Sequence, residues 1–168
     1  MTAALGGPAG KALAGIDRVA GWAVIAAACA MTAIVFTQVV LRYGFNTSID
    51  WAEEVARLTF VWFMFLAVPL GVRGGAHIGI EFVMNAFPEV LRQVLPRLMA
   101  GLSAFLMGVV CWHSVVLLVG QWDENLPTLE VSVGWFMLPI AIGAAHSILH
   151  LVAIAVAGAP RHDLLSAE

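Results

Sequence analysis

Two histidines, His146 and His150, stand four residues apart in an uncharged stretch near the C-terminus. On an α-helix this spacing places both imidazoles on one face, where they could share a metal ion. However, no Cys, Asp or Glu lies near them in the sequence, and the H-E-x-x-H motif is absent. We therefore expect no metal site, and we favour helix packing or a hydrogen bond across a helix bundle as the role of the pair.

A third histidine, His113, raises the alternative of a b-type haem held between two helices. Counted along the expected helices, His113 lies roughly 12 Å and His146 roughly 20 Å below the outer membrane surface. This offset strains a haem between them, so a haem-binding redox subunit is kept only as the alternative function. The sequence also lacks a Ser-His-Asp set and a Gly-rich phosphate loop. We expect no enzymatic activity, catalytic residue, substrate-binding residue or cofactor.

Charged residues gather in "DWAEEVARL", residues 50–58. Asp50 and Glu53 have the spacing of a helix capping box, and Glu53 can pair with Arg57 one turn later. These charges would start a helix and hold Arg57 near a membrane surface. The functional alternative is that one of them reaches another subunit.

Four long apolar runs must position these groups. The chain of 168 residues is 61% hydrophobic and 11% charged, whereas soluble domains carry about 25% charged residues. A membrane-spanning helix needs roughly 20 apolar residues. We predict an all-α integral membrane protein with a single transmembrane domain over 1–168, a flexible tail over 1–15, and helices at about 16–41, 51–73, 97–120 and 133–157.

The second connection, from Arg73 to about Arg97, contains an amphipathic segment. Its apolar residues fall on one helical face, and Pro88 and Glu89 suit a helix start. We predict a short interfacial helix there, with a bend at Pro96 into the next span.

Basic residues predict the orientation, because Lys and Arg mark the cytoplasmic side. Cytoplasmic termini place six of the eight basic residues inside: Lys11, Arg18, Arg73, Arg92, Arg97 and Arg161. The same topology places six acidic residues outside and five inside, Asp17 among the latter. Three outer acids, Asp123, Glu124 and Glu130, form either a docking surface or a merely solvated loop.

A transport path is not visible in this sequence. No Asp, Glu, Lys or Arg stands in the middle of an expected helix, and such residues usually mark an ion or substrate path. Small residues that permit close helix contacts do occur, namely Ala26, Ala30, Gly101, Gly108, Gly143 and Ser147.

The stretch from residue 41 to 82 resembles the small membrane subunit, DctQ, of tripartite ATP-independent periplasmic (TRAP) transporters. The pattern is Arg-Tyr, Trp-x-Glu-Glu-x-x-Arg, a Trp-containing helix, then Arg-x-x-x-His-Ile and an acid. Its residues here are Arg42, Tyr43, Trp51, Glu53, Glu54, Arg57, Trp62, Arg73, His77, Ile78 and Glu81. A weaker resemblance includes Trp135 and Pro139. Glu81 stands where the family often has Asp, which keeps the charge.

The resemblance implies a four-helix scaffold in the bacterial inner membrane, bound to a large permease subunit of DctM type. That partner would carry the sodium and substrate sites, and a DctP-type periplasmic protein would deliver an organic acid. Membrane lipids are further partners, and no nucleic acid is expected. Residues that would secure the junction are Arg42, Tyr43, Trp51, Glu53, Glu54, Arg57, His77 and Glu81.

Overall fold

The chain folds into four long helices and no strands within the part that the structure, a computed structural model, describes: residues 8–73 and 89–157. They are α1 (Pro8–Gly44), α2 (Ala52–Arg73), α4 (Glu89–Gly120) and α5 (Gly134–Ala157). Each is long and apolar enough to cross a membrane. The predicted fold class, an all-α protein with four membrane-spanning helices, is confirmed.

Helix α1 starts earlier than the sequence reading placed it. It begins at Pro8 and has 37 residues, so residues 8–15, expected in a flexible tail, are helical. Proline suits the first helical position because its missing N–H has no partner there in any case. At 1.5 Å per residue the helix is about 55 Å long, well beyond the roughly 30 Å of a bilayer core. One end of α1 therefore extends past the hydrocarbon or the helix tilts strongly.

Helix α4 also differs from expectation at its start. The amphipathic residues from Glu89 onward form the first turns of α4, and the helix continues through Pro96 to Gly120. They therefore do not form a separate interfacial helix. The turn predicted directly after Arg73, and Pro88 itself, lie outside the described residues.

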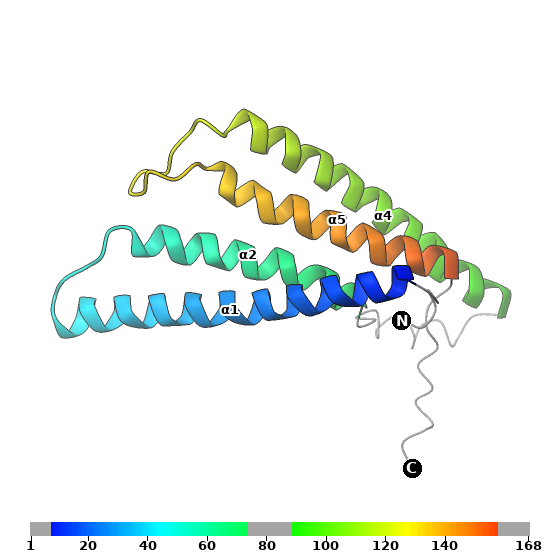
Figure 1. Ribbon diagram of the computed structural model, residues 1–168, viewed down its shortest axis with the longest axis horizontal. Helices are drawn as coiled ribbons and strands as arrows, with labels where there is room; N and C mark the ends of the chain where they lie inside the picture. The colour runs from blue at the N-terminus through cyan, green and yellow to red at the C-terminus, as the bar shows by residue number, and fades with distance from the viewer. Residues whose placement is uncertain (1–7, 74–88, 158–168) are drawn as a thin grey trace, which may run out of the picture.

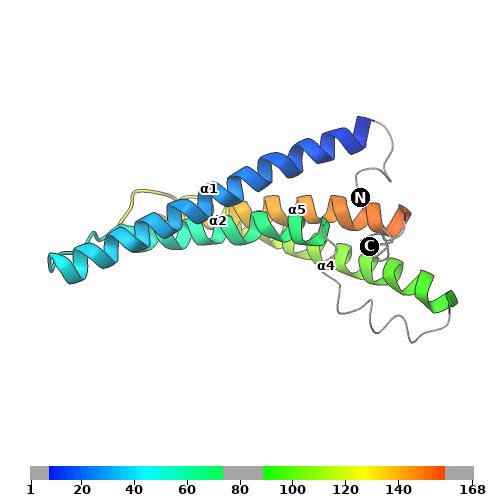
Figure 2. The same cartoon turned by 90° about the horizontal axis from the view of Figure 1, so that it is seen from below.

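The four helices lie side by side in one layer rather than in a closed four-helix bundle. Their order across the layer is α1, α2, α5, α4 (Figure 1). Seen from below, α1 crosses the others at an angle and its N-terminal end swings away (Figure 2). Such a layer has two broad faces, so most apolar side chains do not meet another helix. Within the apolar stretch of 18 residues that qualifies each helix as a membrane span, half of the residues of α5 are buried and none of those of α1.

Helix α5 packs closely on α2 because a glycine faces the contact. A Cβ added at Gly143 would lie 2.2 Å from the carbonyl oxygen of Phe65. Ser147, one turn further on, is fully buried. The rings of Trp62 and Trp135 meet with centroids 6.3 Å apart. The predicted small-residue contact is thus found at Gly143 and Ser147, whereas Gly101, Gly108, Ala26 and Ala30 are not at a close helix contact.

Both described connections lie at the same end of the layer (Figure 1). In the first, the Gln38 side chain exchanges hydrogen bonds with the backbone of Ile49, at 3.4 and 3.3 Å. In the second, Asn125 and Ser132 form an isolated antiparallel bridge. Because α2 begins at Ala52, Trp51 takes the position before the helix. The predicted capping box with Asp50 as N-cap is therefore not formed.

A buried carboxylate–histidine cluster and a charged end of the helix layer

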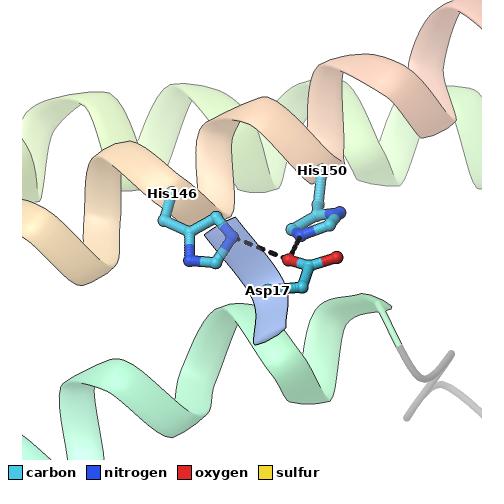
Figure 3. Close-up of side chains that lie close together, drawn as sticks. All are labelled: Asp17, His146 and His150. Carbon is cyan, nitrogen blue, oxygen red and sulfur yellow. Dashed lines mark hydrogen bonds and ion pairs between the residues drawn. The ribbon is translucent and has the colours of Figure 1, made fainter. Parts of the chain in front are cut away.

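A carboxylate and two imidazoles meet inside the helix layer. The Oδ1 atom of Asp17 lies 2.9 Å from Nε2 of His146 and 2.8 Å from Nε2 of His150 (Figure 3). All three residues are buried, with His150 only 1% exposed. Both imidazoles point their Nε2 atoms at the same carboxylate oxygen, so one acceptor takes two N–H donors.

Three helices contribute to this cluster. Asp17 comes from α1, where Leu13 and Ala20 of the same face are also buried. His146 and His150 come from α5, one turn apart, with ring centroids 5.0 Å from each other. Because α1 and α5 are not neighbours in the layer, Asp17 reaches α5 only where α1 crosses at an angle.

Arg73, the last residue of α2, brings the opposite charge. Its Nη1 lies 3.3 Å from Oδ2 of Asp17, and its side chain is 44% exposed. The contact is an ion pair without a hydrogen bond, because Oδ2 has no hydrogen-bond partner among the described residues. Burying a lone carboxylate is expensive. The two N–H donors and the nearby guanidinium together compensate for the buried charge of Asp17.

Sequence reasoning missed Asp17 as part of a site. The topology predicted from the sequence puts Asp17 among the acids of the inner surface, but it is buried at 2% exposure. A signal was available, since Leu13, Asp17 and Ala20 have the spacing of one helical face. The hydrogen bond across the helices, favoured for the His146 and His150 pair, is present.

The haem alternative has no support in the described residues. It needs His113 on α4 to face a histidine of α5, but His113 is exposed, whereas His146 and His150 are buried against Asp17. Its neighbours Cys111 and Ser114 are less exposed, and Cys111 donates to the carbonyl oxygen of Ala141 on α5 at 3.7 Å. His113 therefore lies away from the α5 contact.

At the other end of the layer, the two glutamates of the Trp-x-Glu-Glu motif have different roles. Both carboxylate oxygens of Glu54 accept from the backbone N–H of Thr128, each at 3.2 Å. This contact joins α2 to the connection between α4 and α5. Glu53 instead pairs with Arg57 along the helix at 3.5 Å, as predicted, with both side chains largely exposed.

The other predicted interface residues at this end are open to the surroundings. Arg42, Tyr43 and Trp51 are exposed, Tyr43 at 82%. Arg42 also lines an open pocket of about 540 Å³, together with Gln38, Asp50, Glu53 and Thr128. His77 and Glu81 lie outside the described residues.

The three predicted docking acids are exposed as well. Asp123, Glu124 and Glu130 all belong to the connection between α4 and α5. They share an end of the layer with Glu53 and Arg57, whereas the Asp17 cluster lies toward the opposite end, where α1 begins and α2 ends (Figure 1).

Comparison with known proteins identifies the family. Residues 31–161 match the family model described as "Tripartite ATP-independent periplasmic transporters, DctQ component". The C4-dicarboxylate TRAP transporter small permease protein DctQ of Vibrio cholerae is 33% identical over 96 residues, which are 56% of this chain and 38% of that protein. The protein of the same name from Rhodobacter capsulatus is 27% identical over 67% of this chain and 53% of its own length.

A longer relative also matches. The sialic acid TRAP transporter permease protein SiaT of Haemophilus influenzae is 34% identical over 64 residues, 38% of this chain and 10% of that protein. In each of these three alignments the chain spans about half of the relative's length or less. The family model, in contrast, covers most of the chain. The chain therefore belongs to the DctQ component family of the tripartite ATP-independent periplasmic transporters, whose members are transport components rather than enzymes.

Proposed function

We propose that this chain is a small permease subunit that supports a larger membrane partner and does not carry solute itself. The observation that carries the proposal is the open layer of helices. Large apolar side chains are exposed along α1 and α4, the two edge helices, including Trp22, Phe36, Phe105 and Trp112. Lipid can cover such faces, but four helices in a single layer enclose no channel between them.

The charged groups support the same proposal. In the described part of the chain, Asp17 is the one buried residue among Asp, Glu, Lys and Arg, and its carboxylate is already engaged by two histidines and Arg73. Transport paths through membrane proteins are usually marked by ionisable residues that face a water-filled cavity. Here the buried charge joins helices instead.

The proposed partner is a large permease subunit of DctM type. The sialic acid permease SiaT supports this proposal. The segment that is similar to this chain makes up only 10% of SiaT, so that protein joins such a segment to a much larger permease part. We further propose that the partner carries sodium-coupled uptake of an organic acid, delivered by a periplasmic binding protein. The exposed residues Arg42, Tyr43, Trp51 and Arg57, with His77 and Glu81, are proposed to contact the partner.

Co-purification tests this function. The tagged chain, extracted in mild detergent from its native membrane, should bring down a much larger multi-span protein at constant stoichiometry. Charge reversal at Arg42 and Arg57 should weaken that association more than reversal of the basic residue Lys11 at the opposite end. A chain that purifies alone, from cells whose uptake is unchanged after its deletion, contradicts the proposal.

We place the protein in the bacterial inner membrane with both termini cytoplasmic. This orientation puts the connection between α4 and α5 on the periplasmic side. A single cysteine at Thr128, in a chain lacking Cys29 and Cys111, should then react with a membrane-impermeant maleimide in intact spheroplasts. Labelling only after lysis would show that this connection is cytoplasmic and that the topology is the reverse of the proposed one.

The outer acids are proposed to dock the periplasmic binding protein. Asp123, Glu124 and Glu130 are exposed, and exposed charges steer association through fields that salt screens, with a Debye length of about 8 Å at physiological ionic strength. The triple change to lysine should slow uptake several-fold at low salt and less at high salt. Uptake that stays unchanged at every salt concentration would mean that the loop is only solvated and does not dock the binding protein.

A further inference from the structure

We propose that Asp17, His146 and His150 form a binding site for a divalent transition-metal ion, with Zn²⁺ as the best fit. This inference is independent of the proposed function, because the subunit can support a partner with or without a metal. From the sequence, we expected no metal at the histidine pair because no third donor lay nearby. The fold supplies that donor from 129 residues away along the chain.

The donor types suit zinc. Two imidazole nitrogens and one carboxylate oxygen form a mixed N/O set, which Zn²⁺ accepts in tetrahedral geometry with water in an open position. Magnesium and calcium prefer sites made of oxygen atoms. The site therefore discriminates between zinc and the more abundant alkaline-earth ions.

The geometry is arranged in advance. The donor atoms of the three residues lie within 4.8 Å of one another, and all three side chains are buried. The histidines share one face of α5, and both Nε2 atoms are directed at Asp17 (Figure 3). Zinc bonds of about 2.0–2.2 Å place ligand atoms roughly 3.3 Å apart in a tetrahedron. The present O···N separations of 2.8 and 2.9 Å thus need an opening of about half an ångström, and the two Nε2 atoms, which lie within 4.8 Å of each other, must reach the same spacing.

Zinc binding requires a proton to shift within each imidazole. Each neutral imidazole transfers its proton from Nε2 to Nδ1, so the metal replaces the two N–H···O bonds without net proton release. Nδ1 of His150 has no hydrogen-bond partner among the described residues, so this transfer opposes binding. The affinity is therefore lower than in a structural zinc site whose ligands all have second partners.

Arg73 must also yield to the metal. Its guanidinium lies 3.3 Å from Oδ2 of Asp17, where it repels a second cation. The side chain is 44% exposed and at the end of α2, so it can swing out to water or lipid phosphate. Oδ2 is then free to take the fourth position at the metal in place of the water. The substitution R73Q should consequently tighten zinc binding several-fold.

Metal titration of the full chain tests the site. The chain is purified in detergent, treated with chelator, and dialysed against Zn²⁺, after which bound zinc is counted by mass spectrometry. We expect one zinc per chain and an upward shift of the thermal unfolding midpoint that saturates with zinc. H146Q and H150Q should each lose the bound ion and the shift. H113Q changes a histidine outside the cluster and should keep both, and Mg²⁺ should cause no shift.

Cobalt gives an optical readout that does not depend on a variant folding. Co²⁺ added to the wild-type chain should produce the visible d–d absorption of a four-coordinate ion, and Zn²⁺ should abolish it. The proposal is overturned if wild-type protein takes up no zinc, if folded H146Q or H150Q binds as wild type does, or if cobalt shows only the weak spectrum of a six-coordinate ion.

Discussion

At the scale of single residues, the same acid type serves two purposes in this chain. Asp17 is buried and joins α1 to α5 through two imidazoles, whereas Asp123 lies exposed in a connection. Membrane interiors make this difference large, because an unpaired carboxylate there has neither water nor a counter-charge. Removing any partner of Asp17 therefore leaves uncompensated polar groups between helices.

The substitution D17A should destabilise the chain strongly. Breaking a buried charged pair by removing one partner costs about 3–5 kcal/mol, and here two histidines and Arg73 lose their common acceptor. We expect a clear fall in the unfolding midpoint measured by tryptophan fluorescence in detergent. D123A is the matched control and should change it little. Equal midpoints for both variants would mean that the cluster does not hold the helices.

The two adjacent glutamates should separate in a hydrogen-exchange experiment. Glu54 accepts from the Thr128 amide, whereas Glu53 makes an exposed pair with Arg57. E54A should lose about 1 kcal/mol and E53A a few tenths, since exposed pairs contribute little. The exchange rate of the Thr128 amide should rise in E54A and stay as in wild type in E53A. A faster exchange of the Thr128 amide in E53A than in E54A would contradict the contact between Glu54 and Thr128.

At the scale of elements, α5 organises the layer because it contacts both α2 and α4. Its face toward α2 carries Gly143 and Ser147, which let the two backbones approach. Close approach of this kind replaces the hydrophobic driving force that helices lack in lipid. The α2–α5 contact thus depends on the absence of a side chain at one position.

Gly143 offers a sharp test of that contact. In G143A the new methyl group would lie 2.2 Å from the Phe65 carbonyl oxygen, so the helices must separate. Overpacking of this kind costs about 1–3 kcal/mol. G108A is the matched control, because a Cβ there meets nothing within 4 Å. Thermal unfolding in detergent should show a lower midpoint for G143A only; an unchanged midpoint would contradict the packing.

The sequence alone predicted the four helices, but not which helices pack against one another. Uncharged runs predict the four spans because the bilayer demands such lengths. The start of α1 at Pro8 was not predicted because residues 8–15 carry no apolar run. The burial of Asp17 was not predicted because it depends on how α1 crosses the layer. The residues of the family motif came from the resemblance and the Glu53–Arg57 pair from its spacing, yet only the fold shows that Glu54 reaches Thr128 while Glu53 does not.

At the scale of the whole molecule, the layer explains why a chain so rich in apolar residues buries so few of them. In the described part of the chain, the buried apolar residues are mostly alanines and leucines at helix contacts. Both broad faces stay apolar, and the charged groups lie at the two ends of the layer or pair inside it, as Asp17 does with Arg73. Such a molecule can widen the membrane-embedded surface of a larger protein, but its four described helices enclose no route for a polar solute.

Reconstitution into liposomes tests this central claim most directly. Uptake of a labelled organic acid, with the periplasmic binding protein and a sodium gradient present, is measured for this chain alone, for the co-purifying large subunit alone, and for both together. We predict background uptake for this chain alone and full uptake only when the two subunits are combined. Sodium-driven uptake by vesicles that contain this chain without the large subunit would contradict the account.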